Sequence, residues 1–385
     1  MSRTVTINFD GPLARHRQLA PAASVRVSPL CLGAMTFGDK QKERYGECNQ
    51  DEAFAILDYF YSQGGNFIDT ANVYQLGQSE EWVGQWMASR NNRDDIVLAT
   101  KYTNNPRAGD KNIIYSNYGG NGTKSLKYSI DLSLKRLQTS YVDILYVHYW
   151  DFATSIEEIM HTLNDLVHAG KVHYLGISDA PAWVVSKANQ YARMSGLRPF
   201  VLYQGMWNAS MRDFERDIIP MCENEGMAII PYGVLNQGRF QTEEGFKQRE
   251  KNNPGRNFVP LSDHDKKVSK ALEVTANKKG VSIFAVALAY VRSKAPYVFP
   301  LVGARKIDHI KGNAESLDVR LSDEQIEEID TAYPFDHGFP HTFLSGTMFK
   351  GDVIARGASA PGDVWLTESL GKFDWVEKPK SLDHK

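Results

Sequence analysis

The sequence contains little cysteine and no long apolar run. Its 385 residues include three cysteines, Cys31, Cys48 and Cys222, which are too few and too widely spaced for a disulfide framework or a cysteine-based metal site. Such low cysteine content is typical of a reducing compartment, so we expect a cytoplasmic protein without a bound metal. No stretch approaches the roughly 18 consecutive apolar residues of a membrane-spanning helix.

Strong charge of either sign is also missing. The formal net charge is −2 and the sequence pI is near 6.6, which argues against a general nucleic-acid binder or a basic protein of membrane surfaces. We therefore expect a small-molecule partner rather than nucleic acid or a membrane. The sequence leaves the oligomeric state open.

What the chain does have is an alternation of strand-like and helix-like segments from residue 28 to about residue 310. Parallel strands joined by helical crossovers, in eight units, close into a barrel, so we expect an α/β fold of the (β/α)8 TIM-barrel class. The alternative is a doubly wound open sheet, which usually carries a glycine-rich first turn, and no Gly-x-Gly-x-x-Gly follows a strand here. The strands are expected at residues 28–38, 66–71, 95–102, 142–149, 172–178, 200–207, 227–235 and 297–303.

Other segments fall outside the repeat, and we expect the whole chain, residues 1–385, to form one domain with a barrel core at about 28–330. Residues 17–27 are expected to form a short hairpin that closes the bottom of the barrel. Long polar loops are expected at 103–124 and 237–260. The extension at 331–385 is rich in aromatic residues, so we expect it to pack back on the barrel, near the substrate mouth.

Two pairs of residues are spaced as helix capping boxes. Thr154 with Glu157, and Ser322 with Gln325, each place a hydroxyl three residues before an acidic or amide side chain. Each pair predicts the start of a helix.

Four reactive side chains lie at or just beyond the ends of expected strands: Asp69, Tyr74, Lys101 and His148. A barrel gathers such positions on one face, where its active sites form. A free phenol titrates near ~10, and an ammonium within a few ångströms lowers that value. We therefore expect Lys101 to lower the pKa of Tyr74, the general acid, while Asp69 pairs with Lys101.

His148 would hydrogen-bond the substrate oxygen beside Tyr74 and polarise the carbonyl group. A lone lysine–aspartate pair or a lone strand histidine is more often structural than catalytic. Four compatible groups at the ends of three successive strands indicate a carbonyl reductase instead. Side chains cannot deliver hydride, so the site needs a nicotinamide cofactor.

The cofactor has candidate ligands at other strand ends. Gly303 and Arg305 lie where the eighth expected strand runs into a helix, a place suited to phosphate, although an ordinary capped turn has the same pattern. Polar groups for the nicotinamide amide are Ser178, Asp179 and Gln204, and Tyr232 can stack on the nicotinamide ring, with Gly233 beside it. An aromatic substrate pocket is expected from Met35, Tyr102, Trp150 and Trp207, with His148 and Tyr149, although about half of these fit core packing equally well.

Several long motifs make the chain similar to a known family. They are Asn-Phe-Ile-Asp-Thr-Ala-Asn-Val-Tyr at 66–74, Ala-Thr-Lys-Tyr at 99–102, Ser-Leu-Lys-Arg-Leu-Gln-Thr-Ser-Tyr-Val-Asp-Ile-Leu-Tyr-Val-His at 133–148 and Gly-Lys-Val-His-Tyr-Leu-Gly-Ile-Ser-Asp at 170–179. Across residues 17–330 the chain resembles the aldo-keto reductase superfamily, and within it the fungal aryl-alcohol dehydrogenases and norsolorinic acid reductases. The resemblance implies an NADP-dependent barrel that reduces aldehydes and ketones.

The resemblance also assigns residues. It places the catalytic tetrad on the four reactive side chains above, and it adds His309 and Asn313 to the grip on the adenosine phosphate. Two positions depart from the common pattern: Asp179 stands where many members have asparagine, and Gln75 where many have glycine. An aspartate accepts the amide hydrogens of nicotinamide but cannot donate to the amide oxygen.

The leading hypothesis is NADPH-dependent, reversible reduction of aryl aldehydes or ketones to alcohols. One alternative is the same chemistry on a larger ketone, as a tailoring step of a fungal secondary-metabolite pathway. Another is a cofactor-holding, redox-sensing binding module, as in the β subunits of voltage-gated potassium channels, which resemble this barrel.

Overall fold

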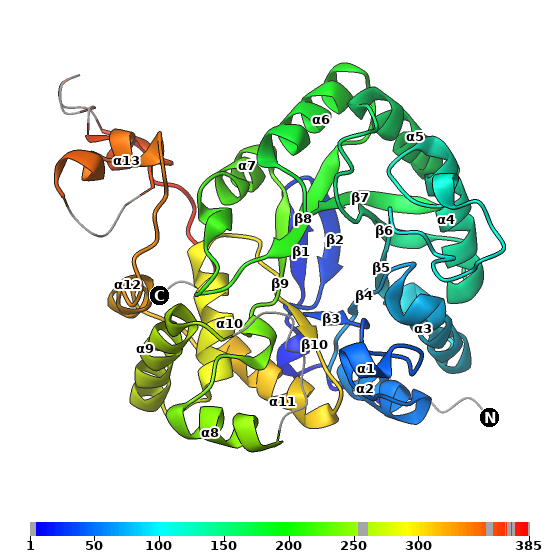
Figure 1. Ribbon diagram of the computed structural model, residues 1–385, viewed down its shortest axis with the longest axis horizontal. Helices are drawn as coiled ribbons and strands as arrows, with labels where there is room; N and C mark the ends of the chain where they lie inside the picture. Colours follow the sequence, from blue (N-terminus) through cyan, green and yellow to red (C-terminus); the bar gives the residue numbers. More distant parts are fainter. Residues whose placement is uncertain are drawn as a thin grey trace.

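The computed structural model describes residues 5–252, 261–351, 357–365, 367, 371 and 374–383, without the side chains of 248–252. Its centre is a barrel of parallel strands in the order β10-β3-β4-β5-β6-β7-β8-β9 (Figure 1). The strands are β3 (Cys31–Gly33), β4 (Phe67–Asp69), β5 (Val97–Tyr102), β6 (Val142–Val147), β7 (Val172–Ser178), β8 (Phe200–Met206), β9 (Ala228–Tyr232) and β10 (Leu301–Gly303).

The two ends of this strand order meet and close the barrel. Ile229 of β9 bridges Val298, just before β10, in parallel. The amide of Ile229 donates to the carbonyl of Tyr297 at 3.0 Å, and the amide of Phe299 donates back to Ile229 at 2.9 Å. The predicted barrel is therefore confirmed over the open sheet. The first strand is shorter than expected because the chain turns after Ala34, whose carbonyl accepts from Phe37.

Helices surround the barrel as a ring (Figure 1). They are α2 (Gln50–Ser62), α3 (Gln78–Arg90), α4 (Thr123–Leu137), α5 (Ile156–His168), α6 (Ala182–Met194), α7 (Ile218–Glu225), α10 (Ile283–Lys294) and α11 (Ile307–Glu315). Helices α9 (Asp263–Lys279) and α12 (Asp323–Asp330) lie outside this ring, with α9 against α10 and α12 against α9 (Figure 1). Short helix α1 (Lys42–Tyr45) lies between β3 and α2, and short helix α13 (His341–Leu344) lies in the C-terminal extension. Helix α8 (Glu243–Asn252) occupies part of the stretch expected to be a loop, and residues 253–260 of that stretch lie outside the described residues.

One predicted capping box is confirmed and one is wrong. Ser322 and Gln325 cap α12 reciprocally. At α5 the N-cap is Ser155, which accepts from the amide of Glu158, one residue later than expected. Asp151 causes the shift, because its carboxylate accepts both the amide and the hydroxyl of Thr154.

Alternation along the strands separates an inner from an outer core. Ile144 and Tyr146 belong to the cluster inside the barrel, while Leu145 and Val147 belong to the cluster under the helices. This is the orientation that the sequence predicts. The expected hairpin is also present, as antiparallel strands β1 (Arg17–Ala20) and β2 (Ala23–Val27), and its apolar side chains join the inner cluster and plug the barrel.

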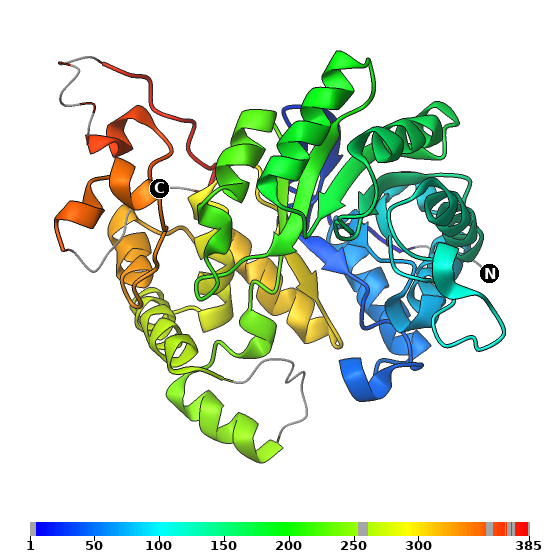
Figure 2. The same ribbon diagram turned by 45° about the horizontal axis from the view of Figure 1, so that its top comes forward.

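The C-terminal extension packs against the outside of the helix ring. Both views place α13 away from the barrel centre (Figures 1 and 2), and His341 of α13 lies 3.7 Å from Asp217, just before α7. Tyr333 stacks on His264 of α9 at 3.8 Å, and the Arg216 guanidinium lies 4.5 Å over the Phe335 ring. Packing against the barrel's helices is present as expected, and a position near the substrate mouth stays a prediction. Among the described helices, none combines the length and the apolar character needed to cross a bilayer.

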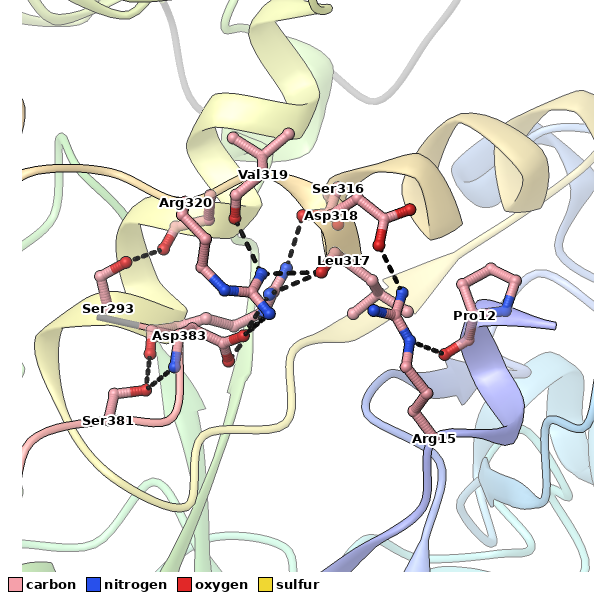
Figure 3. Close-up of polar contacts among 12 residues, drawn as sticks. Pro12, Arg15, Ser293, Ser316, Leu317, Asp318, Val319, Arg320, Ser381 and Asp383 are labelled. Atoms are coloured by element: carbon pink, nitrogen blue, oxygen red, sulfur yellow. Dashed lines mark hydrogen bonds and ion pairs between the residues drawn. The ribbon is translucent and has the colours of Figure 1, made fainter. Parts of the chain in front are cut away.

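The far end of the extension is fixed by one buried carboxylate, Asp383 (Figure 3). Arg17 of β1 donates to it at 2.8 and 3.0 Å, Arg292 of α10 at 2.6 and 3.2 Å, and Arg320 lies 3.3 Å away. The side chain of Arg292 is fully buried and also donates to the carbonyl of Ser316 at 2.7 Å. Asp383 therefore ties the hairpin, α10 and the segment after α11 to the extension.

We expect Asp383→Asn to lower the free energy of unfolding by about 3–5 kcal/mol at pH 7, because it leaves buried arginines without a counter-charge. Burial raises the pKa of Asp383, but hydrogen bonds from Arg17 and Arg292 outweigh it and hold the pKa well below the usual range. The stabilisation is therefore present above the unfolded value of ~3.9 and is lost as the pH falls below it.

Urea unfolding at pH 7 and in acid measures this prediction. The matched control is Asp318→Asn, which breaks an exposed pair with Arg15. Equal stability of the two variants at pH 7 would contradict the role given to Asp383.

Candidate active site

A buried ion pair lies inside the barrel at the ends of β4 and β5. Lys101 Nζ donates to the Asp69 carboxylate and to the carbonyl of Thr70 at 2.9 Å. The other oxygen of Asp69 accepts from Gln204 Nε2 at 3.0 Å. The Lys101 and Asp69 side chains are 0% and 2% exposed, so this pair is dry. The predicted pairing is present, and Gln204 supports it from β8.

Burial and charge act in opposite directions on the two members of the pair. For Asp69, burial raises the pKa, and Lys101 and Gln204 only partly offset this effect. For Lys101, burial lowers the pKa, but Asp69 and Tyr74 outweigh burial, so the net change is upward. Lys101 therefore keeps its charge beside the phenol.

Tyr74 opens the turn η2 (Tyr74–Gly77) that follows β4. Its ring centroid lies 5.1 Å from Lys101 Nζ, so the phenol and the ammonium are neighbours as the sequence predicts. Lys101 lowers the Tyr74 pKa as expected, but burial and the Asp69 charge raise the pKa by more, so the net shift is upward. The phenol therefore keeps its proton at neutral pH and is a proton donor.

His148 stands on the other side of Tyr74. The two ring centroids are 5.9 Å apart and the planes are nearly perpendicular, at 83°. Burial and the Lys101 charge lower the pKa of His148 to about 3, so the ring is neutral at neutral pH. The side-chain nitrogen of Asn104 lies 3.0 Å from His148 Nδ1. The sequence analysis missed Asn104, although this residue comes three positions after Lys101, just beyond the end of the same strand.

Asn72, which the sequence analysis also missed, locks the turn that carries Tyr74. Its amide donates to the carbonyl of Lys101 at 3.1 Å, and its side chain donates to the carbonyl of Asn104 at 2.9 Å and to Ser129 at 2.7 Å. Its own carbonyl accepts from Arg136 at 2.8 Å. One residue thus connects the tyrosine turn, the lysine strand and the loop that touches His148.

The four expected nicotinamide ligands lie at neighbouring strand ends. Ser178 of β7 is the register partner of Gln204 of β8. Tyr232 at the end of β9 donates its hydroxyl to Asp179 at 3.2 Å. Desolvation raises the pKa of Asp179 to about 6, although Tyr232 lowers it, so this carboxyl is partly protonated near pH 6. Gly233 follows in a turn with a φ of 68°.

The expected phosphate site lies where β10 leads into α11. Gly303 is exposed, and a Cβ added there would meet nothing within 4 Å, so a ligand can approach its backbone. The amide of Arg305 donates to His309 Nδ1 at 3.4 Å, which brings two of the expected residues together. Asn313 is buried on the same helix. An open backbone, a guanidinium and a helix start fit a phosphate-bearing cofactor.

Two of the expected substrate residues point away from the barrel interior. Tyr102 and Trp207 both belong to the outer hydrophobic cluster. The Tyr102 hydroxyl donates to the carbonyl of Asn121 at 3.2 Å, and Trp207 stacks on Phe214. The structure therefore gives them packing roles. The remaining expected residues, Met35, Tyr149 and Trp150, are partly or fully exposed at strand ends.

We expect Asp69→Asn to lower the free energy of unfolding by about 3–5 kcal/mol, because it leaves the buried Lys101 ammonium unpaired. The double variant Asp69→Asn/Lys101→Met removes both charges and should recover much of this loss. Chemical denaturation of the three proteins measures the difference. A double variant no more stable than the single one would show that the unpaired charge is not the cause.

Comparison with known proteins agrees with this geometry. The model of the Aldo/keto reductase family matches residues 29–334. The chain is 65% identical to norsolorinic acid reductase B of Dothistroma septosporum, over 95% of this chain and 93% of the relative. It is 52% identical to an aryl-alcohol dehydrogenase of Pestalotiopsis microspora, over 96% and 93%.

A third relative is the aryl-alcohol dehydrogenase [NADP(+)] of Phanerodontia chrysosporium, 50% identical over 92% of this chain and 94% of the relative. The matches cover the barrel and most of the extension. The protein is therefore an oxidoreductase that belongs to the aldo/keto reductase family.

Proposed function

We propose that the protein uses NADPH to reduce aryl aldehydes or ketones to alcohols, reversibly. The observation that carries the proposal is the protonated Tyr74 phenol beside the buried Lys101 ammonium. This pair suits proton delivery to an oxygen that gains negative charge. Relatives named aryl-alcohol dehydrogenase support the aromatic substrate.

In this mechanism the bound nicotinamide supplies the hydride. Tyr74 gives its proton to the carbonyl oxygen, and the Lys101 charge stabilises the phenolate that remains. Asp69 keeps Lys101 charged and in place through their buried contact. His148 is neutral, so its ring N–H donates a hydrogen bond to the same oxygen and orients the carbonyl.

The cofactor would lie across the strand ends. Arg305, with His309 and Asn313, would hold the adenosine phosphate, and Gly303 would let it approach the backbone. A relative whose name includes NADP(+) supports this choice. At the other end, Ser178, Asp179 and Gln204 would hold the carboxamide, and Tyr232 with Gly233 would line the nicotinamide face.

A second candidate is the same reaction on a larger ketone. Tyr149, Phe152 and Trp183 follow the neighbouring strands β6 and β7, and their side chains are 39%, 71% and 61% exposed. The segments that follow β6 and β7 are joined, because the amide of Trp150 donates to the carbonyl of Asp179, and Trp183 lies in the first turn of α6. Exposed aromatic rings at a site entrance suit a flat, extended substrate. Relatives named norsolorinic acid reductase support this candidate.

We expect Tyr74→Phe to lower the reduction rate by ~10²–10⁴-fold, because the hydroxyl that delivers the proton is gone. NADPH oxidation with a single-ring aldehyde and with a fused-ring ketone measures the loss. NADPH binding, followed by fluorescence, should be retained. Tight cofactor binding with no turnover by the unaltered protein would favour the redox-sensing alternative.

We expect Arg305→Ala to weaken NADPH binding by roughly 10- to 100-fold, because charge-assisted hydrogen bonds to the phosphate are lost. NADH lacks that phosphate and should be affected much less. Titration of both cofactors provides the comparison, with Arg15→Ala as a surface control. Equal weakening of NADPH and NADH would assign Arg305 another role.

A further inference from the structure

The His148 ring has a polar side-chain partner in the segment that follows β5. Asn104 Nδ2 lies 3.0 Å from His148 Nδ1, and the backbone amide of His148 donates to Thr103 Oγ1 at 3.2 Å. Both partners come from the segment directly after β5. His148 is therefore held to the segment after β5 at two points, once through its ring and once through its backbone amide.

Asn104 is itself fixed in place. Its carbonyl accepts from the Asn72 side chain at 2.9 Å, and that side chain also donates to Ser129 at 2.7 Å. The Asn72 backbone is bound to Lys101 and Arg136. The amide that meets His148 is therefore anchored to the same framework as the tyrosine turn.

A neutral imidazole carries one proton, either on Nδ1 or on Nε2. A carbonyl oxygen only accepts hydrogen bonds, so a ring that polarises it must present the protonated nitrogen. An amide N–H donor beside one ring nitrogen favours the form in which that nitrogen is unprotonated. The lowered pKa of His148 excludes the doubly protonated ring at neutral pH.

We propose that Asn104 is a positioning residue for carbonyl reduction: its side-chain N–H donates to His148 Nδ1 and so keeps the ring proton on Nε2, where it serves the substrate oxygen. The effect of Asn104 on catalysis rests on the proposed function. The state of the ring, in contrast, is a property of the protein alone and can be measured without turnover.

The first experiment is nitrogen NMR on the full chain with 15N-labelled histidine. His148 is one of 10 histidines, and the spectrum of His148→Gln identifies its signals. We expect a protonated Nε2 and an unprotonated Nδ1 at neutral pH. A proton on Nδ1 would overturn the inference, whatever the enzyme activity.

The second experiment compares Asn104→Leu, similar in size but without the donor, with Asn105→Leu as the matched control. Asn105 accepts from the amide of Arg107 at 2.8 Å in the same loop, and no described contact joins its side chain to His148. Asn104→Leu should mix the two ring forms in the spectrum and lower kcat roughly five- to tenfold, the effect of one lost hydrogen bond. The control should change neither quantity.

The readouts separate two kinds of failure. An unaltered protein with the expected ring form but no reductase activity would overturn the proposed function and leave the ring assignment standing. An active protein whose ring form and kcat are unchanged in Asn104→Leu would overturn the role of Asn104. NADPH affinity unchanged to within about twofold in Asn104→Leu separates its effect on the reaction from loss of the fold.

Discussion

The contact between Asp69 and Lys101 is the constraint on which the rest of the site depends. Taking two charges out of water is costly, and their attraction compensates only where further hydrogen bonds satisfy them. Here the Thr70 carbonyl and the Gln204 amide supply those bonds. They come from different strands, so the pair is stable only inside a closed barrel. The fold thus permits an ammonium to stay charged where no water screens it.

That unscreened charge acts on a phenol that is itself partly withdrawn from water. Burial raises the pKa of Tyr74 and the Lys101 charge lowers it, with burial the larger effect. The resulting acid is weak in the resting site but gains most from Lys101 once it becomes a phenolate. Under the proposed mechanism, the ammonium would stabilise the transition state more than the ground state, which is the condition for catalysis. In the same mechanism, the neutral His148 ring would add a hydrogen bond without a competing charge.

The sequence predicts the barrel and the tetrad because both follow from local patterns: alternating segments and reactive residues at strand ends. Strand parity could also have excluded two substrate candidates. Lys101 faces the interior, so its neighbour Tyr102 must face the helices. Gln204 also faces the interior, so Trp207, three residues later, must face the helices as well. The roles of Asn72 and Asn104 could not be predicted, because they depend on contacts between separate loops. The net shift of the Tyr74 pKa could not be predicted either, because it depends on how deeply the phenol is buried, which the sequence does not give.

The turn after Tyr74 holds Gln75 in a strained backbone conformation. Gln75 and Leu76 adopt left-handed φ values of 51° and 56°, a region that glycine enters freely and other residues rarely. The Gln75 side chain is buried, and its Oε1 accepts from the amide of Gln41 at 2.7 Å. A glycine would relax the backbone but would lose this link to the segment after β3, which carries Met35. The strain is therefore stored where the Tyr74 turn is joined to the segment that carries Met35.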